Sequence, residues 1–558
     1  MGETMARGGV VRSQEAWTLP WRGLGLSSNL NASDSPHPYR LLDASPGLFD
    51  FVEYSAPLSL EETRAHATLY PEMAGRLGQV PVLFHPVHLN LYGPERESAQ
   101  ALADLEAHAQ AVGSAWVGND VGWWHAGGQS FPGYLYLPPP LTLEGLEDCV
   151  AHALHVQAGL GRPLALENPA VFARRGDMHV LDFMAGLHAR TGLPLLIDVG
   201  HLFSYQLSAG LPLEVGWDGF PFEQVIELHL AGGVVTRRGS RGFYVDDHTQ
   251  PVRDELFTLL ERLLARCPSL RAVTFEGDGH PPEVARLTLE RLRRWIPAEP
   301  RPPLALKPPA EVPVPALRNA SKPWELFELG YGARPPEPRD DPEGSVAETD
   351  FRLAVVAEQL DRTYPLSRLL LAGTRDTLRA FTASPEFREL FQGLGRSLEH
   401  AFLSYARRHL RAQPDEGGSA ALSFEVFLPS VMQRPHAPPG PGEVGLAADA
   451  GVGAFAADLS ELVYTARALR RHLTGRAWAC EVLEVSGLES LAQTARRVVL
   501  RPWRFAVRRR AGHLEVQTAP APLLEMLRTL AAGPLQEAAL PPALLAEALG
   551  RGWVRRGA

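Results

Sequence analysis

The stretch Leu195-Leu-Ile-Asp-Val-Gly-His201 decides the fold of the first half of the chain. It is a short apolar run that ends in Asp198 and His201, the pattern of a buried parallel strand that delivers polar side chains at its carboxyl end. Four other apolar runs end in the same way, at His85, Glu167, His229 and Glu276. Packing alone does not explain five strands that each end in a residue able to bind a metal.

Strand-like and helix-like segments alternate from Gly23 to about Ile296, which is typical of a parallel α/β fold. Eight strands in about 275 residues predict a TIM (β/α)8 barrel, whose active site lies at the C-terminal ends of the strands. A doubly wound open sheet is the alternative, but no Gly-x-Gly-x-x-Gly motif follows the first strand. The expected strands are Gly23–Leu26, Phe49–Glu53, Val80–Phe84, Ala115–Gly118, Pro163–Leu166, Leu193–Ile197, Val225–Leu230 and Ala272–Phe275.

The chain has 558 residues, more than one hydrophobic core usually serves, so two or more domains are expected. We predict an N-terminal extension over residues 1–22 and the barrel over 23–296. Paired prolines between 297 and 345 indicate a linker without regular structure. Apolar residues at helical spacing predict a mainly helical α+β accessory domain over 346–558, with a hairpin at 504–517 that turns at Ala511-Gly512.

Composition narrows the function class. Hydrophobic residues make up 45% of the chain and charged residues 21%, as in ordinary soluble proteins. A net charge of -10 argues against a nucleic-acid partner. Cys149, Cys267 and Cys480 are far apart, which indicates reduced thiols and a cytoplasmic location. The sequence has no secretory signal and no apolar run long enough to span a bilayer, so no membrane association is expected.

Histidines and acidic residues at or beyond the strand ends form a candidate metal-binding set. Imidazole and carboxylate ligands without thiolate suit iron, manganese or zinc. Several carboxylates in one pocket cannot all stay ionised without cations among them, so the set predicts two or three metal ions. Any one of these residues could instead cap a helix, but their recurrence at successive strands favours the metal. The set is His85, Asp120, Glu167, Asp198, His201, His229, Asp246, His248 and Glu276.

Neighbouring residues leave alternatives open. Asp246 and His248 could chelate one ion or form a solvated turn, whereas Asp198 and His201 could reach the same ion or adjacent ones. Adjacent tryptophans could wall a substrate pocket or pack beneath a loop. These are Trp123 and Trp124, and the weaker histidine candidates are His88, His125 and His280.

Six short motifs follow one another along the barrel half. In order and spacing they resemble the multinuclear non-haem iron-dependent oxidases over about residues 23–296. The resemblance implies a TIM barrel that uses two or three iron ions and dioxygen to modify residues, mostly cysteines, of a ribosomally made precursor peptide. The motifs are Phe-His85-Pro-Val-His-Leu, Leu-Glu167-Asn168-Pro169, Ile-Asp198-Val, Glu-Leu-His229-Leu-Ala-Gly, Asp246-Asp-His248 followed by Pro251-Val252, and Phe-Glu276-Gly-Asp278.

The chain departs from that family at three places. Asp120 stands where the family has the histidine of Ser-Glu-His-Leu. Asp198-Val-Gly-His201 replaces Asp-Val-Asn-Asn, and Gly232-Gly233 replaces a Gly-His pair. Asp198-x-x-His201 is similar to the tri-metal barrels of endonuclease IV and the sugar isomerases, in which that histidine binds metal.

The oxidase hypothesis assigns roles by this resemblance. Glu167, Asp198 and Glu276 are the expected catalytic residues and share an inner cluster with His229. The outer ligands would be His85, Asp120, His201, Asp246 and His248, with Asn168 orienting a ligand.

Two other function classes remain open. One is a zinc- or manganese-dependent hydrolase or sugar isomerase, and the other is an inactive barrel that serves as a binding scaffold. The accessory domain faintly resembles winged-helix peptide-recognition modules, in which a leader peptide could add a strand at the hairpin edge beside Arg508, Arg509 and Arg510. A plain helical accessory domain is the alternative.

Overall fold

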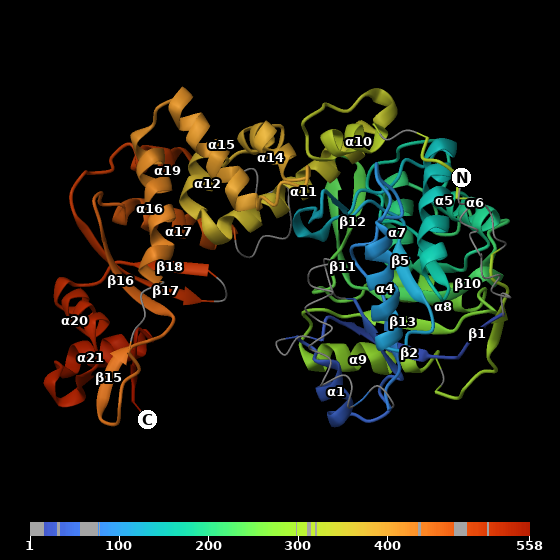
Figure 1. The fold of residues 1–558 in the computed structure, drawn as a ribbon, viewed down its shortest axis with the longest axis horizontal. Helices are drawn as coiled ribbons and strands as arrows, with labels where there is room; N and C mark the ends of the chain where they lie inside the picture. The colour runs from blue at the N-terminus through green and yellow to red at the C-terminus, as the bar shows by residue number, and fades with distance from the viewer. Residues whose placement is uncertain are drawn as a thin grey trace, which may run out of the picture. The chain divides into compact units, whose positions relative to one another are not determined.

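The computed structural model describes residues 16–30, 34–55, 76, 79–296, 298–309, 314–318, 321–432, 437–473, 488–510 and 513–557. The chain divides into two compact units, and Figure 1 shows the course of each. The first contains residues 1–330 and 335–348, and the second contains 331–334 and 349–558. No helix within the described residues is long and apolar enough to cross a membrane.

Eight parallel strands close into a barrel in the first unit, which confirms the predicted TIM fold. Neighbours around the barrel follow the order β2-β3-β4-β5-β8-β9-β10-β13, and β13 pairs with β2 to complete the circle. All eight lie at the predicted places. They are β2 (Gly23–Ser28), β3 (Phe51–Tyr54), β4 (Val82–Phe84), β5 (Val117–Asp120), β8 (Leu164–Glu167), β9 (Leu195–Asp198), β10 (Val225–Ala231) and β13 (Ala272–Glu276).

Helices cover the outside of the strands (Figure 1). In α8, five apolar residues between Leu256 and Leu263 recur at helical spacing and are buried, while Asp254 and Glu255 complement the positive end of the helix dipole. The helices of this layer are α1 (Pro38–Ala44), α4 (Ala99–Ala111), α5 (Leu143–Gly159), α6 (Val180–Thr191), α7 (Val199–Ala209), α8 (Asp254–Leu264) and α9 (Pro282–Arg293).

Strand register sets the height of the polar residues inside the barrel. Asp120 of β5 pairs with Glu167 of β8, and Asp198 of β9 pairs with His229 of β10. Glu167 itself pairs with Leu196, two residues before Asp198. Three of the four residues end their strands and His229 lies two residues before the end of β10, so all four lie toward the C-terminal end of the barrel. The N-terminal end of the barrel is closed by apolar side chains, among them Phe51, whose ring fills the space that a Cβ on Gly25 would occupy.

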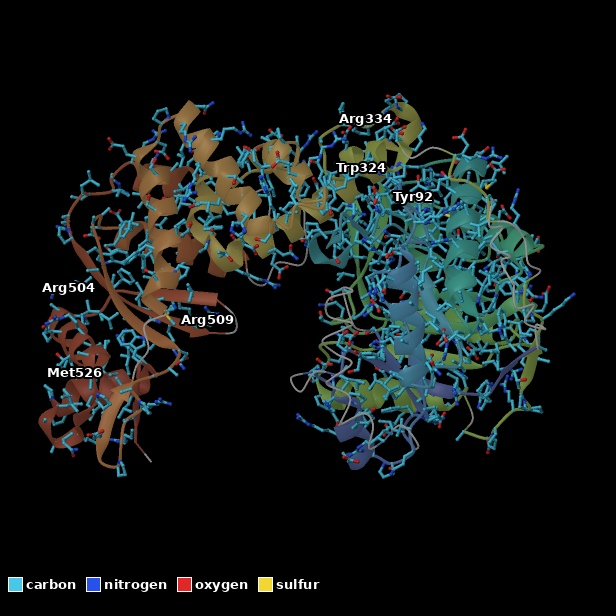
Figure 2. The ribbon with its side chains drawn as sticks, in the orientation of Figure 1. Tyr92, Trp324, Arg334, Arg504, Arg509 and Met526 are labelled. Atoms are coloured by element: carbon cyan, nitrogen blue, oxygen red, sulfur yellow. The ribbon has the colours of Figure 1, made fainter. Side chains whose placement is uncertain are left out.

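The prediction that 297–345 lacks regular structure is wrong. Two β-strands, β1 (Trp17–Leu19) and β14 (Leu304–Leu306), pair antiparallel, so part of the expected N-terminal extension is also tied to the first unit. In helix α10 (Lys322–Gly330), the Trp324 ring packs edge-on against Trp123 at 5.2 Å. Figure 2 labels Trp324 on this helix. The many prolines predicted a linker, but β14 and α10 form because they contact segments that are distant in sequence.

The second unit is mainly helical. Helix α11 (Pro342–Thr363) begins in the first unit and continues into the second. Three strands form one sheet in the order β16-β17-β18, and three others form a sheet in the order β19-β15-β20. The remaining helices are α12 (Pro365–Leu371), α13 (Arg375–Thr382), α14 (Pro385–Glu389), α15 (Leu398–Ala412), α16 (Glu416–Met432), α17 (Ser460–Leu473), α19 (Leu488–Ala495), α20 (Ala521–Ala532) and α21 (Pro542–Gly550).

The predicted hairpin is present as β17 (Trp503–Arg510) and β18 (His513–Gln517), joined by β16 (Ala450–Phe455). Its turn at Ala511-Gly512 and Cys480 lie outside the described residues. The other short strands are β15 (Glu443–Leu446), β19 (Leu535–Gln536) and β20 (Val554–Arg556).

Buried Phe424, Trp503 and Phe505 lie in the core between the helices and the β16-β17-β18 sheet. The buried Glu425 carboxylate accepts hydrogen bonds from the backbone N–H groups of Leu366 and Ser367, which begin α12. This polar residue therefore satisfies a helix end that the core would otherwise leave without partners.

Candidate metal centre

Histidines and carboxylates converge inside the barrel at the C-terminal ends of its strands. Four overlapping triads each bring three ligand atoms within 4.8 Å of one another. Every residue of the triads is buried, and four of them belong to two triads each. The triads are Glu53-His85-His229, His85-Asp120-Glu167, Glu167-Asp198-His201 and Asp198-His229-Glu276.

One side of the centre is built on β4, β5 and β8. His85 follows the end of β4, and its Nε2 lies 3.5 Å from Asp120 Oδ2 and 3.5 Å from Glu167 Oε2. Gly118 makes room for this imidazole, because a Cβ there would lie 2.9 Å from His85 Nδ1. The three side chains thus face one point from three neighbouring strands.

His201 enters the centre from the first turn of α7. Asp198 caps this helix by accepting a 2.5 Å hydrogen bond from the His201 backbone N–H. The ring Nδ1 lies 3.6 Å from Asp120 Oδ1 and 3.6 Å from Glu167 Oε1, and Nε2 lies 3.5 Å from Asp246 Oδ2. The imidazole therefore lies among carboxylates from three different segments, facing neither bulk solvent nor the apolar core.

The opposite side of the centre is built on β10 and β13. His229 Nδ1 lies 3.6 Å from Glu167 Oε1 and 3.6 Å from Glu276 Oε1. The other ring nitrogen, Nε2, lies 2.9 Å from Glu53 Oε2 on β3. His229 thus connects the centre to a carboxylate deeper in the barrel.

The rim of the centre comes from the loop after hairpin strands β11 (Gly233–Arg238) and β12 (Arg241–Asp246). His248 Nε2 lies 3.1 Å from Asp246 Oδ2 and 3.8 Å from Glu276 Oε2. Its Nδ1 lies 3.3 Å from Asp278 Oδ2. The His248 and Asp278 side chains are 30% and 36% exposed, so the centre opens to solvent on this side.

Two polar residues hold the ligands from behind. The Asn168 amide Oδ1 accepts a hydrogen bond from the Asp198 backbone N–H at 2.8 Å, and its backbone oxygen lies 2.9 Å from His201 Nδ1. The Tyr136 hydroxyl accepts a 2.6 Å hydrogen bond from the Ala170 N–H and is hydrogen-bonded to Asp120. Asn168 thus restrains the Asp198 backbone and the His201 ring, and Tyr136 restrains the Asp120 carboxylate.

Burial and crowding shift the acid–base equilibria of the whole cluster. Burial, reinforced by the nearby Asp120 carboxylate, raises the pKa of Glu167 well above its usual range, and burial raises the pKa of Glu276 to about 7. Burial alone would lower the pKa of His85, but Asp120 and Glu167 outweigh it and raise that pKa to about 9. Without metal, the negative charges of these crowded carboxylates can be balanced only by protons that the carboxylates and imidazoles share. Bound cations would take the place of those protons.

The donor atoms present fit metal ions. Several side-chain atoms of these residues are buried and have no hydrogen-bond partner among the residues that the structure describes. Such atoms are costly to bury unless another group satisfies them, and the mixture of nitrogen and oxygen suits first-row transition metals. These atoms include His85 Nδ1, Asp120 Oδ1, Glu167 Oε2, Asp198 Oδ2, His229 Nδ1 and Asp246 Oδ1.

Seven of the nine residues of the sequence-predicted set belong to the triads. The other two, Asp246 and His248, lie beside them, at 3.5 Å from His201 Nε2 and 3.8 Å from Glu276 Oε2, whereas the weaker candidates do not belong to the triads. His125 Nε2 lies 3.0 Å from Glu97 Oε1, away from the cluster. Trp123 is fully buried and packs against Trp324 of helix α10, and the buried Trp124 ring packs on Tyr136. His88 and His280 are buried outside the triads.

Sequence reasoning missed two carboxylates in the barrel interior, Glu53 and Glu227. Glu53 is the last residue of a predicted strand, and a carboxylate at the end of an apolar run is the same feature that identified Glu167. Glu227 lies two residues before His229, and side chains two apart in a strand face the same side. Both were therefore recognisable from strand periodicity.

The family model for the RiPP precursor modification enzymes MbnB/TglH/ChrH matches residues 33–294. A UPF0276 protein of Caulobacter vibrioides is 31% identical over 218 residues, which is 38% of this chain and 75% of the relative. Another from the same organism is 28% identical over 265 residues, 47% of this chain and 90% of the relative. A UPF0276 protein of Vibrio parahaemolyticus is 27% identical over 252 residues, 43% of this chain and 87% of the relative.

Among solved structures, endonuclease IV from Thermus thermophilus covers 49% of this chain and 98% of its own, with 21% identity and a TM-score of 0.31. A xylose isomerase domain protein from Planctomyces limnophilus covers 50% and 99%, with 18% identity and a TM-score of 0.32. The first unit is a closed eight-stranded barrel with clustered histidines and carboxylates, and its sequence aligns with most of the length of the UPF0276 proteins. The chain belongs to the MbnB/TglH/ChrH family of RiPP precursor modification enzymes.

Proposed function

We propose that the protein is a di- or tri-iron oxidase that uses dioxygen to modify residues, most simply cysteines, of a ribosomally made precursor peptide. The observation that carries the proposal is the unbroken series of triads, in which neighbouring triads share residues. Shared carboxylates are suited to bridge adjacent ions, because each has two oxygens. Glu167 and Asp198 occupy these shared positions.

Each part of the cluster would hold a different ion. His85, Asp120 and Glu167 suit one position, Asp198, His229 and Glu276 a second, and the rim residues Asp246 and His248, with His201, a third. These nine residues are four histidines and five carboxylates. Such a donor set is typical of non-haem iron sites, whereas structural zinc sites are rich in thiolates. Iron bound there would supply the redox chemistry with dioxygen and lower the pKa of a substrate thiol.

The residues of the chain would shape the reaction around the ions. Asn168 contacts Asp198 and His201, and Tyr136 contacts Asp120, so these two residues restrain three of the ligands. The exposed rim at His248 offers the entry for the peptide. Glu276 lies next to that rim, with its Oε2 at 3.8 Å from His248 Nε2.

We further propose that the second unit binds the precursor peptide. Within the described part of that unit, β18 is an edge strand, and such an edge can pair with an added peptide strand. Figure 2 labels Arg504 and Arg509 toward opposite ends of β17. Arg508 is not available as predicted, because it binds Asp449, whereas Arg509 is exposed and suits an acidic peptide. A cytoplasmic site of action, with reduced Cys149 and Cys267, completes the proposal.

The test is a reaction with a defined peptide. Protein purified anaerobically and loaded with iron is mixed with the cysteine-containing precursor peptide encoded beside it, and the peptide mass is followed after admission of dioxygen. A mass change that requires iron, dioxygen and Glu167 supports the proposal, with Glu167→Gln as the inactive variant and Glu261→Gln, at an exposed position of α8 in the barrel unit, as the matched control. An unchanged peptide with iron-loaded protein contradicts it.

A further inference from the structure

A layer of buried polar side chains lies directly beneath the candidate metal centre. Glu53 on β3 and Glu227 on β10 are each 1% exposed. The Thr274 hydroxyl of β13 lies between them, 3.1 Å from Glu227 Oε1 and 3.3 Å from Glu53 Oε2. The Trp116 indole N–H donates to Glu227 Oε2 at 2.6 Å. Burying two carboxyl groups in a barrel is costly, so their retention calls for an explanation.

The two nitrogens of the His229 ring face different surroundings. Nδ1 faces the centre, where Glu167 and Glu276 each approach to 3.6 Å. Nε2 faces the layer below, 2.9 Å from Glu53 Oε2. A histidine that binds a metal through one nitrogen usually gives the N–H of the other to a carboxylate or carbonyl, which fixes the tautomer and the ring orientation.

We propose that Glu53 is a positioning residue that orients His229 for metal binding through Nδ1. Glu53 Oε2, 2.9 Å from His229 Nε2, would accept the Nε2–H when Nδ1 binds metal, and the Thr274 hydroxyl contacts the same carboxylate from β13. Glu227 accepts the Trp116 indole N–H and contacts the same Thr274 hydroxyl, which completes the layer. The inference rests on the proposed function, because it assumes that the centre above His229 holds metal.

The geometry also offers a competing role for Glu53. Its carboxylate, His85 and His229 place ligand atoms within 4.8 Å of one another, so Glu53 could itself be a ligand. The other ring nitrogen favours positioning: His229 Nδ1 faces Glu167 and Glu276 in the centre, so a metal bound through Nδ1 leaves the Nε2–H to face Glu53.

Titration of the metal-free full-length protein with Co²⁺, followed by visible absorption and metal analysis, separates these roles without relying on activity. We expect Glu53→Gln and Glu53→Ala to keep the wild-type number of bound ions and to lower their affinity, by about 10- to 100-fold for the alanine variant. Glu53→Gln should lose less, because the amide oxygen still accepts the His229 N–H. Glu425→Gln, an equally buried change in the second unit, is the matched control and should bind Co²⁺ as the wild type does.

Three results overturn the inference. Loss of one bound ion in both Glu53 variants makes Glu53 a ligand, and wild-type affinity in both makes it a structural residue only. If neither variant folds, Thr274→Val provides the readout, and unchanged Co²⁺ affinity there refutes positioning. A wild-type protein that binds no Co²⁺, Fe²⁺ or Zn²⁺ instead removes the proposed function, so the two failures are distinguishable.

Discussion

Gly118→Ala tests how tightly the barrel holds its metal ligands. A Cβ at this position would lie 2.9 Å from His85 Nδ1 and 3.1 Å from Leu196 Cδ1, whereas ordinary contacts begin at 3.4 Å. The His85 ring must therefore retreat by about 0.5 Å, which exceeds the roughly 0.2 Å within which metal–ligand distances are held. Overpacking of this kind costs about 1–3 kcal/mol of stability.

The expected result is a fall in metal affinity of about 10- to 100-fold, the range found when the support of a metal-bound histidine is disturbed. The assay is a competition titration with a chromophoric chelator, alongside thermal unfolding of the same samples. Gly550→Ala is the control, because a Cβ there meets nothing within 4 Å. If Gly118→Ala binds metal with wild-type affinity, His85 is not a ligand in the arrangement described.

Three further predictions concern stability. Phe327→Ala empties a fully buried site between α10 and the barrel and should cost about 3–5 kcal/mol in urea unfolding, whereas a change below about 1 kcal/mol would mean that α10 is not part of the barrel unit. Tyr136→Phe leaves the half-buried Ala170 N–H without its acceptor and should cost about 1 kcal/mol by the same method, and no loss would refute the hydrogen bond. Burial raises the pKa of Glu425 from 4.5 to about 7, so the folded state binds more protons than the unfolded state between these values, and the stability contributed by the proton is lost as pH rises through 7. Thermal unfolding of Glu425→Gln from about pH 5 to 8 should show less decline than the wild type, and equal slopes would contradict this.

The sequence predicted the barrel because its signal is local. Each strand is a short, mostly apolar run, and several end at a polar side chain, as β9 does at Asp198, so such runs can be recognised without knowing their partners. Parallel strands then bring their carboxyl ends together, so the nine candidate ligands could be gathered before any distance was known.

The remaining features depend on contacts between distant segments. Strand β14 is only three residues long and pairs with β1, which is far away in sequence. The sequence around β14 is rich in proline, so the local pattern predicted a linker and gave no sign of this pairing. Trp123 gave no local sign of whether it faces a pocket or packs, and the position of Trp324 decided this. Glu53 was recognisable as a strand-end carboxylate, but its contact with His229 required the barrel to close.

The most direct test of the proposed centre is elemental analysis of the full-length protein after anaerobic purification from iron-supplied cells. The clustered triads predict about two or three iron ions per chain, falling when Glu167 and Asp198 are both changed to alanine. Zinc at that stoichiometry with negligible iron would contradict the oxidase, and a protein without bound metal would contradict the metal centre itself.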